Sequence, residues 1–274
     1  MTPALAAALS PRHVVRSTPL AGGCVGEVRR LDLDDGSRLV AKLGPGLEAE
    51  AFMLQWLADH TRLPLPRLQH ASDEVILMEF VETGGALAQE DAADHLATLH
   101  QHAWERFGFT RNTAIGGLDQ PNQPADRWCD FFRHQRLLAM ADQAHAAGRL
   151  PTALRHHLDR LAERLDQWLD EPPAPSLIHG DAWGGNILCR HDRVIAFVDP
   201  AIHYADAEIE LAFGTLFGTF DERFFARYAE HRPLRPGFWE ARRDLLNLYP
   251  LLVHVRLFGG SYVGDVERTV RRFV

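Results

Sequence analysis

The stretch LIHGDAWGGNILCRHDRVIAFVD, residues 177–199, places three oxygen-bearing side chains at fixed intervals around two apolar runs. Asp181 follows His-Gly, Asn186 comes five positions later, and Asp199 ends the second apolar run. The apolar runs predict short strands, so we expect the three side chains at strand ends and in the loop between them, converging on one point. Asp, Asn and Gly are also the usual turn residues, so the triplet alone is equally consistent with a shaped turn.

The same triplet meets the needs of phosphoryl transfer. That reaction requires a carboxylate near the attacking hydroxyl, a divalent metal on the phosphate oxygens, and cations that hold the phosphates. Asp181 fits the carboxylate, whereas Asn186 and Asp199 carry the hard oxygen ligands that Mg²⁺ prefers. Kinase catalytic loops contain the same order of Asp, four residues and Asn, followed by an Asp on the next strand.

Two upstream features favour a nucleotide site. Lys42 ends the strand-like run LVAKL, and Glu50 lies on the helix that follows, where it could pair with Lys42 and direct it toward phosphate. The loop PLAGGCVGEV, residues 19–28, contains Gly22, Gly23 and Cys24 just before a strand, and glycines there would let backbone amides approach phosphates. Each feature alone is common, and a bare glycine loop is more often a turn. The order of the features along the chain carries the prediction.

Composition excludes several classes of protein. With 274 residues and 46% apolar content, the chain can bury a sizeable core. Its formal charge of −8 has the wrong sign for a dedicated nucleic-acid or anionic-membrane binder. The apolar run before Ser10 is too short for a signal peptide and no later run approaches a membrane span, so we expect a cytoplasmic protein. Three widely spaced cysteines indicate free thiols rather than disulfides or a zinc site.

The chain divides by composition into a β-rich part and a helical part. Residues 1–83 read as strands with one inserted helix, and the glycine-containing sequence ETGG at 82–85 is a plausible hinge. Residues 84–274 are mainly helical, which predicts two unequal lobes, 1–83 and 84–274. The predicted strands cover 27–33, 37–44 and 74–81, with a hairpin turn at DDGS, 34–37, and a second hairpin is predicted at RHDR, 190–193, between NILC and VIAFVD. The predicted helices cover 47–60, 89–104, 126–148, 151–170 and the chain from 206 onward. In the first of them the spacing of Leu47, Phe52, Leu54 and Leu57 predicts one apolar face.

Taken together, these motifs resemble the fructosamine kinase (ketosamine-3-kinase) family, a branch of the protein-kinase-like fold that also holds aminoglycoside and choline phosphotransferases. The resemblance implies an α+β bilobal fold, with a small β-rich N-lobe and a larger helical C-lobe. The residues that carry it are GGCV at 22–25, IGGLDQPN at 115–122, RWCDFFRHQRL at 127–137, HGDAWGGN at 179–186, FVDPAIHYADAEIELA at 197–212 and LVHVRLFGGSY at 252–262.

The resemblance also implies roles for individual residues. Asp181 resembles the catalytic base, Asn186 and Asp199 the magnesium ligands, and Lys42 with Glu50 the pair that anchors phosphate. The nucleotide would further contact the glycine loop and the hinge segment; these positions are Gly22, Gly23, Cys24, Met78, Glu79, Phe80 and Val81.

Trp183 would present an aromatic face to the sugar part of a substrate, although a partly buried packing role is the alternative. The implied activity is ATP- and Mg²⁺-dependent phosphorylation of a sugar hydroxyl on a ketosamine of the fructosamine or ribulosamine type. The acceptor would be a small glycated amine or a glycated protein lysine, with no nucleic-acid or membrane partner.

Two other functions remain possible at this stage. One is phosphorylation of an aminoglycoside, choline-like or other small alcohol; the other is a nucleotide-binding pseudokinase, which the retained Lys, Asp, Asn and Asp types argue against. Ala182, Gly185 and His203 depart from the family pattern beside the expected acceptor pocket, so the substrate is the least constrained prediction. Cys24 could be oxidisable in a mobile loop, or only a small turn residue. Glu208 and Glu210 resemble an acidic helix start of the family, and a structural role is expected for at least one of them. His179 is also expected to be structural, and the oligomeric state is not predicted.

Overall fold

A computed structural model describes residues 2–20 and 26–274 of the chain. Its N-terminal part is a five-stranded antiparallel sheet with the order β1-β2-β3-β5-β4. The predicted strands at 27–33 and 37–44 pair through a turn at Gly36, whose φ of +79° is a conformation that glycine adopts without strain. The strands are β1 (Val14–Pro19), β2 (Glu27–Leu33), β3 (Arg38–Leu43), β4 (Leu68–Ala71) and β5 (Val75–Glu79).

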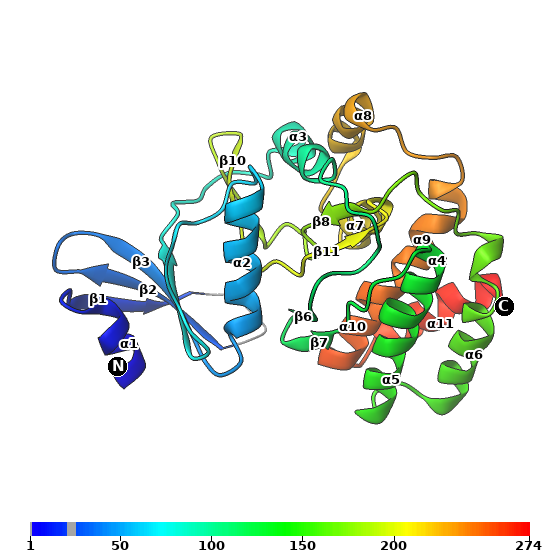
Figure 1. The fold of residues 1–274 in the computed structure, drawn as a ribbon, viewed down its shortest axis with the longest axis horizontal. Helices are drawn as coiled ribbons and strands as arrows, with labels where there is room; N and C mark the ends of the chain where they lie inside the picture. Colours follow the sequence, from blue (N-terminus) through cyan, green and yellow to red (C-terminus); the bar gives the residue numbers. More distant parts are fainter. Residues whose placement is uncertain (1, 21–25) are drawn as a thin grey trace.

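Two helices accompany this sheet. The short helix α1 (Pro3–Leu9) buries Leu5 and Leu9 in an apolar cluster with the sheet, and the sequence analysis had not predicted it. The helix α2 (Glu48–His60) stands between the sheet and the helical half of the molecule (Figure 1). This helix therefore links the two halves through its packing.

The helix α2 has two buried faces. Leu54 packs in a cluster with Ile76 and Met78 of the sheet, whereas Met53 belongs to the large core of the C-terminal part. Phe52, which we predicted on the buried face, is only half-buried, and its ring meets Phe109 edge-on at 6.2 Å. The prediction had assumed one buried face, but a helix between two lobes uses two.

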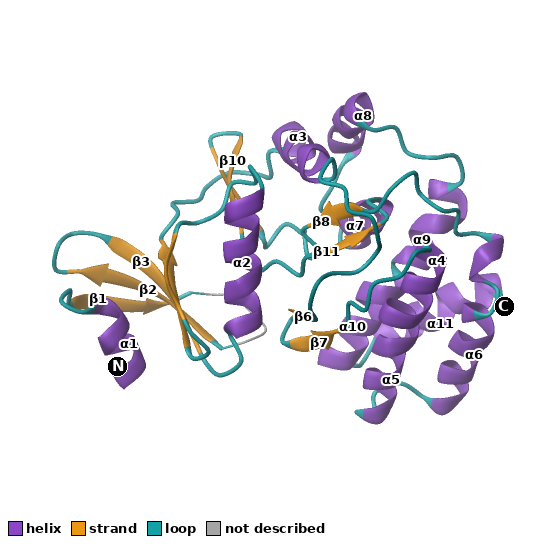
Figure 2. Cartoon of the chain, in the orientation of Figure 1, coloured by secondary structure: helices purple, strands orange, loops and turns teal. Residues whose placement is uncertain are grey.

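Helices dominate the rest of the chain, and strands there are short (Figure 2). The α+β architecture predicted from the sequence is therefore confirmed. The helices are α3 (Gln89–Leu99), α4 (Trp128–Phe131), α5 (Ala139–Ala146), α6 (Thr152–Ala162), α7 (Glu208–Leu216), α8 (Glu222–His231), α9 (Arg243–Leu246), α10 (Leu248–Phe258) and α11 (Tyr262–Phe273).

Two of the predicted helices end earlier than expected. The helix predicted over 89–104 ends at Leu99, and the helix predicted over 151–170 ends at Ala162. A single 3₁₀ turn, η2 (Leu165–Gln167), follows the second helix, and Leu165 is completely buried there. Helical periodicity alone did not predict the change of direction that brings this leucine into the core.

The predicted helix at 126–148 contains a π-helical segment, η1 (Phe132–Leu138), between α4 and α5; a second one, η3 (Phe238–Arg242), precedes α9. The segment η1 carries Arg136, a fully buried cation with no carboxylate among its hydrogen-bond partners. Its guanidinium donates instead to carbonyl and amide oxygens and to the ring nitrogen of His203. Burial accordingly lowers the pKa of Arg136 to about 10. Arg136 thus lies within the π-helical segment, a rare conformation that is frequent at functional sites.

Three two-stranded ribbons complete the fold. The predicted hairpin around residues 191–192 is confirmed: β9 (Ile187–Arg190) pairs with β10 (Arg193–Phe197), and both turn residues, His191 and Asp192, have positive φ. The strands β8 (Ser176–Ile178) and β11 (His203–Ala205) pair, as do β6 (Thr113–Ile115) and β7 (Leu118–Gln120).

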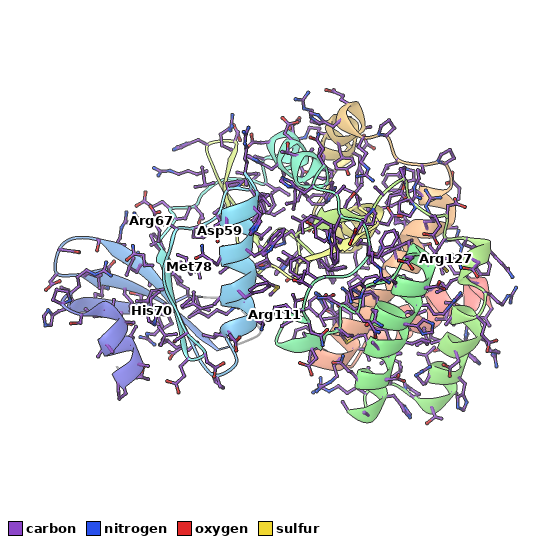
Figure 3. The ribbon with its side chains drawn as sticks, viewed as in Figure 1. Asp59, Arg67, His70, Met78, Arg111 and Arg127 are labelled. Atoms are coloured by element: carbon purple, nitrogen blue, oxygen red, sulfur yellow. The ribbon has the colours of Figure 1, made fainter. Side chains whose placement is uncertain are left out.

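Contacts between the two halves are both apolar and polar. Arg111 lies beside the beginning of α2 (Figure 3), where it bonds Glu48 at 3.2 Å and covers the ring of Phe52. The amide of Phe197 donates to the carbonyl of Pro64 at 2.8 Å. Across residues 2–20 and 26–274, none of the helices combines the length and the apolar character needed to cross a membrane.

Candidate active site

The segment between β8 and β11 positions Asp181. Gly180 has φ +85°, and a Cβ at this position would lie 2.2 Å from the carbonyl oxygen of Ala201. Only glycine therefore allows the two chain segments to approach so closely. The amide of Ala201 donates to the carbonyl of His179 at 2.8 Å, which ties the segment after Asp199 to the segment before Asp181.

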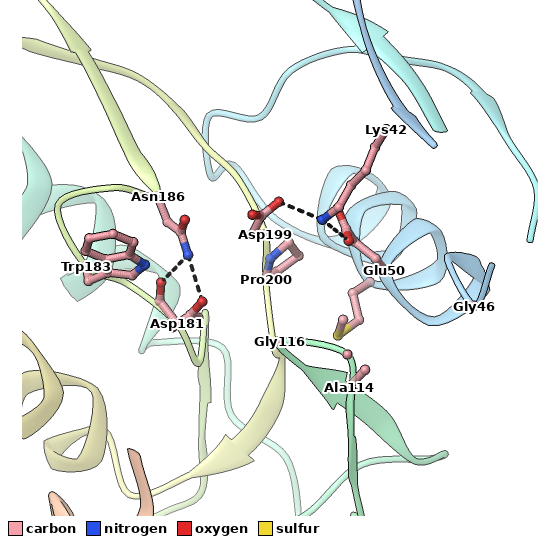
Figure 4. Close-up of a pocket in the computed structure, with 12 residues that line it drawn as sticks. Lys42, Gly46, Glu50, Ala114, Gly116, Asp181, Trp183, Asn186, Asp199 and Pro200 are labelled. Atoms are coloured by element: carbon pink, nitrogen blue, oxygen red, sulfur yellow. Dashed lines mark hydrogen bonds and ion pairs between the residues drawn. The ribbon is translucent and has the colours of Figure 1, made fainter. Parts of the chain in front are cut away.

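Asp181 and Asn186 are directly hydrogen-bonded (Figure 4). The Asn186 amide nitrogen donates to Asp181 Oδ2 at 2.8 Å and to the Asp181 backbone carbonyl at 2.9 Å. The backbone amide of Asn186 donates to the carbonyl of Trp183 at 2.8 Å, which closes the intervening loop. These bonds use the amide nitrogen and leave the Oδ1 oxygen of Asn186 as a free donor atom for a cation.

Lys42 lies between two carboxylates from different parts of the chain. Its ammonium donates to Glu50 on α2 and, at 3.2 Å, to Asp199 after β10. Burial of Lys42 opposes its charge, but Asp199 and Glu50 outweigh that effect and raise its pKa. Burial raises the pKa of Glu50 to about 7. Lys42 is thus a permanently charged cation at neutral pH, aimed at the cleft between the lobes.

Asp181 is held in an environment that strengthens it as a proton acceptor. Burial, and then the neighbouring charge of Asp199, raise the pKa of Asp181 well above its usual range. A carboxylate with a raised pKa accepts a proton more readily than a solvated one. Asp199 itself has φ +52°, a left-handed conformation that is uncommon outside glycine and clusters at functional sites.

Glu210 fixes the backbone that precedes Asp181. This fully buried carboxylate accepts hydrogen bonds from the amides of His179, at 3.0 Å, and Gly180, at 2.6 Å. It also bonds His100 Nε2 at 2.9 Å. Glu208 and Glu210 form the acidic start of α7, where we expected a structural role for at least one of the two, and Glu210 has that role.

His179 and Glu208 have structural surroundings. His179 is completely buried and burial lowers its pKa, so it is neutral at pH 7. Glu208 bonds Arg242 at 2.7 Å and Arg235 at 3.1 Å, away from the cleft. The complete burial of His179 agrees with the structural role that we expected for it, and the ion pairs of Glu208 are structural as well.

The candidate residues from both lobes line one cavity. Lys42, Glu50, Asp181, Trp183, Asn186 and Asp199 share its surface with Gly46 and with the Gly116–Gly117 turn between β6 and β7. Gly22, Gly23 and Cys24 lie outside the residues that the structure describes.

A neighbouring, more apolar hollow extends under the sheet. Met78, Glu79, Phe80 and Val81 all contribute to its surface, together with Val28, Val40 and Leu188. Lys42 and Asp199 line both this hollow and the first cavity, so the two are continuous at these side chains. A flat apolar space beside a cation suits an adenine ring followed by phosphates.

The predicted metal ligands are few. Among the described residues, no group of three or more His, Cys, Asp or Glu side chains could hold a metal ion. Asn186 and Asp199 offer two hard oxygens, which fits Mg²⁺ because this ion usually binds one or two protein ligands and takes phosphate oxygens and waters for the rest. The donor set does not fit a closed structural metal site.

A second hollow, which shares Asp181 with the first cavity, was predicted only through His203, which we expected beside the acceptor pocket. Its surface includes Asp181, His203, Tyr249 and His254. Two of these residues lie within motifs that carried the family resemblance, FVDPAIHYADAEIELA and LVHVRLFGGSY, but the sequence gave no spacing that pointed to a shared cavity.

The chain matches known proteins over its whole length. Residues 4–274 match the model of the family described as fructosamine kinase. A protein of Enterococcus faecium named as a probable ketoamine kinase is 32% identical over 263 residues, covering 93% of this chain and 94% of the relative. A chloroplastic protein-ribulosamine 3-kinase of Oryza sativa is 32% identical over 259 residues, covering 89% of this chain and 74% of the relative.

A solved structure gives the same result for the fold. The crystal structure of a protein from Thermobifida fusca, described as a fructosamine-3-kinase, superposes with a TM-score of 0.83 at 32% identity and covers 98% of both chains. The predicted bilobal, protein-kinase-like fold is therefore confirmed. On the family match, the sequence identities and the shared fold, this chain belongs to the fructosamine kinase family.

Proposed function

We propose that this protein transfers the γ-phosphoryl group of ATP to a sugar hydroxyl of a ketosamine. The observation that carries the proposal is the convergence of Lys42, Asp181, Asn186 and Asp199 on one cavity, next to an apolar hollow that fits adenine. Membership of the fructosamine kinase family supports an ATP-dependent kinase, and relatives named as ketoamine and ribulosamine kinases support the acceptor class.

Asp181 is the proposed base. The acceptor hydroxyl loses its proton to the Asp181 carboxylate while its oxygen forms a bond to the γ-phosphorus, and the bond from that phosphorus to the β-phosphate oxygen breaks to release ADP. The bonds from Asn186 and the Glu210-held backbone fix the orientation of the carboxylate. Orientation of this kind supplies much of the rate acceleration in phosphoryl transfer.

Lys42 is the proposed phosphate anchor. Its ammonium is buried, charged and already directed by Glu50, so little side-chain freedom is lost when it binds the nucleotide phosphates. A fixed cation in a site sheltered from water stabilises negative charge on the transferring group more effectively than a solvated one. The pair would also link nucleotide binding to the position of α2.

Asn186 and Asp199 are the proposed magnesium ligands. Magnesium bound there would neutralise charge on the phosphate oxygens. The Oδ1 oxygen of Asn186 and the second carboxylate oxygen of Asp199 are the donor atoms that remain after the hydrogen bonds to Asp181 and Lys42 are made.

Trp183 is the proposed sugar platform. Its side chain is 42% exposed, which differs from a packing tryptophan, and it lines the cavity beside Asp181. A Cβ at Gly185 would lie 2.4 Å from the indole ring, so glycine at this position lets the ring cover the loop. The close contact with the Trp183 ring therefore explains why this chain has glycine at position 185, where it departs from the family pattern.

The proposal also gives each lobe a role: residues 1–83 bind the nucleotide, and residues 84–274 supply the catalytic residues and bind the acceptor. The acceptors would be small glycated amines and glycated lysines of proteins. A coupled assay of ADP formation, run on ribulosyl-lysine, fructosyl-lysine, an aminoglycoside and choline, tests the acceptor class. Turnover of the aminoglycoside with none of either ketosamine would contradict it and leave the kinase assignment intact.

A further inference from the structure

A second hollow borders Asp181, and Lys42 is not part of its surface. Asp181 and Gly180 form one end of its surface, and Phe213 and His254 contribute aromatic rings to it. Asp181 also lines the cavity that holds Lys42 and Asp199, so the carboxylate is shared by the two spaces. An acceptor whose hydroxyl lies at Asp181 and whose sugar lies on Trp183 could therefore extend its amine substituent toward this second space.

The second hollow adjoins an aromatic surface that we call the aromatic shelf, formed by Phe217, His254, Phe258 and Tyr262. The His254 ring lies 4.9 Å from Phe217, 5.7 Å from Phe258 and 4.9 Å from Tyr262, measured between ring centroids. The shelf is continuous with the hollow because the Phe213 ring meets Phe217 edge-on at 6.1 Å. Residues from the end of α7, the end of α10 and the start of α11 thus meet at one place.

Two members of the shelf expose large apolar side chains to solvent. Phe217 is 44% exposed and Phe258 is 56% exposed. In the described part of the chain, the other Phe, Tyr or Trp side chains exposed to this degree are Trp183 and Trp239. Of these four aromatic residues, Trp183 lines the first cavity, and Phe217 and Phe258 contact rings that line the second hollow. Three of the four therefore lie at or beside the two spaces that share Asp181. Apolar surface left in water beside a catalytic base is typical of a ligand subsite.

The shelf is an apolar surface rather than a charged one. His254 Nδ1 bonds the Pro250 carbonyl at 2.7 Å, which fixes the ring, and burial lowers the pKa of His254, so the imidazole is neutral at pH 7. The nearby Arg149 guanidinium is engaged with the carbonyl of Leu257, at the end of α10. Such a surface favours hydrocarbon over a charged group.

We propose that the aromatic shelf binds the hydrocarbon part of the substituent on the ketosamine nitrogen, and so selects among amines. This inference rests on the proposed function. A ketosamine consists of a sugar and an amine substituent, and Trp183 with Asp181 accounts only for the sugar. The substituent needs a surface that the nucleotide does not occupy, and the shelf adjoins the second hollow, which Asp181 and His254 both line. The four methylenes of a lysine side chain are a hydrocarbon of this kind.

The test compares ketosamines that share one sugar and differ only in the amine. The probes are the ribulosyl adducts of methylamine, propylamine and pentylamine, assayed by kcat/KM in wild type, Phe217→Ala and Phe258→Ala. Trp239→Ala is the matched control, because Trp239 is also 44% exposed but packs against Phe225 and Phe238. Thermal unfolding and the KM for ATP show whether each variant is folded.

In wild type and in Trp239→Ala we expect kcat/KM to rise with chain length by up to about 4-fold per methylene, the factor equivalent to about 0.8 kcal/mol. In Phe217→Ala and Phe258→Ala this rise should be largely lost, with little change for the methylamine adduct. An unchanged pentylamine-to-methylamine ratio in both variants would overturn the proposal. If one variant fails to fold, the other decides the question. No turnover of any ketosamine by wild type would instead refute the proposed function.

Discussion

The ammonium of Lys42 lies 3.2 Å from the Asp199 carboxylate, although 157 positions of sequence separate the two residues. The contact joins β3 of the N-terminal sheet to the end of β10 in the C-terminal part. It places the proposed phosphate anchor beside the proposed metal ligand, so the nucleotide phosphates would bridge the two lobes.

Replacing Lys42 by Met should weaken the use of ATP. Hydrogen bonds to charged groups are worth about 1.5 to 3 kcal/mol, so kcat/KM for ATP should fall by about 10- to 150-fold. Lys42→Arg should restore little, because a planar guanidinium does not occupy the space of a compact ammonium between Glu50 and Asp199. Steady-state kinetics with varied ATP measure the effect. A KM and kcat near those of wild type in Lys42→Met would rule out the anchoring role.

Replacing Asp199 by Asn should raise the Mg²⁺ concentration needed for activity. The variant retains an oxygen but loses the charge that attracts the ion, so half-maximal activity should shift to higher Mg²⁺ at saturating ATP. Asp192→Asn is a suitable control, because Asp192 lies in the β9–β10 turn with φ +57° and Asn tolerates that conformation. Equal Mg²⁺ dependence in the two variants would speak against Asp199 as a ligand.

Replacing Trp183 by Ala should weaken acceptor binding. An aromatic stacking contact is worth about 0.5 to 1.5 kcal/mol, so kcat/KM for the ketosamine should fall by about 2- to 13-fold, and by more if the sugar loses its orientation. In Trp183→Phe the fall in kcat/KM should be smaller, because a phenyl ring still stacks on the sugar. Because Trp183 also borders the nucleotide hollow, the KM for ATP is measured in parallel. An increase in the KM for ATP without an increase for the acceptor would contradict the sugar platform.

Buried histidines make the fold sensitive to mild acid. Burial, and then the charge of Arg136, lower the pKa of His203 well below its ordinary value of 6.5. The unfolded chain takes up this proton as the pH falls through 6.5 and the folded chain does not, so stability present above that pH is lost below it.

Between about pH 7.5 and about pH 5.5, this one histidine should lower the free energy of unfolding by roughly 1 kcal/mol. His203→Gln, which is neutral at both pH values, should lack that part of the loss. Groups with raised pKa values, such as Asp206 at about 6, act in the opposite direction but are common to both proteins. Urea unfolding at the two pH values measures the difference, and equal losses in both proteins would contradict the prediction.

The sequence predicted the parts of the fold that have local causes. The turn at Gly36 and the hairpin at His191 and Asp192 combine turn residues with flanking apolar runs, and both formed as predicted. The strand β1 was missed because its sequence, VVRSTP, is half polar and mostly exposed, as suits the edge of a sheet. The two buried faces of α2 were missed because they depend on a second lobe.

The same distinction applies to the site. Asp181, Asn186 and Asp199 were predictable because they lie within 19 positions of one another, in a spacing that catalytic loops share. The acidic start of α7 indicated a structural role for Glu208 or Glu210, but its partner could not be predicted, because the contact from Glu210 to Gly180 spans 30 positions. The aromatic shelf draws on Phe217 and on residues after 250, so only the folded chain brings its rings together.

Replacement of Asp181 by Asn tests the central claim most directly, with kcat measured on ribulosyl-lysine and ATP binding measured by titration. Loss of the base should lower kcat by about 10²- to 10⁴-fold, because acid–base assistance typically contributes that much, while the affinity for ATP stays close to that of wild type. Wild type should form one sugar phosphate for each ADP released. Near-normal turnover in Asp181→Asn, with ATP binding intact, would contradict the assignment of Asp181 as the base.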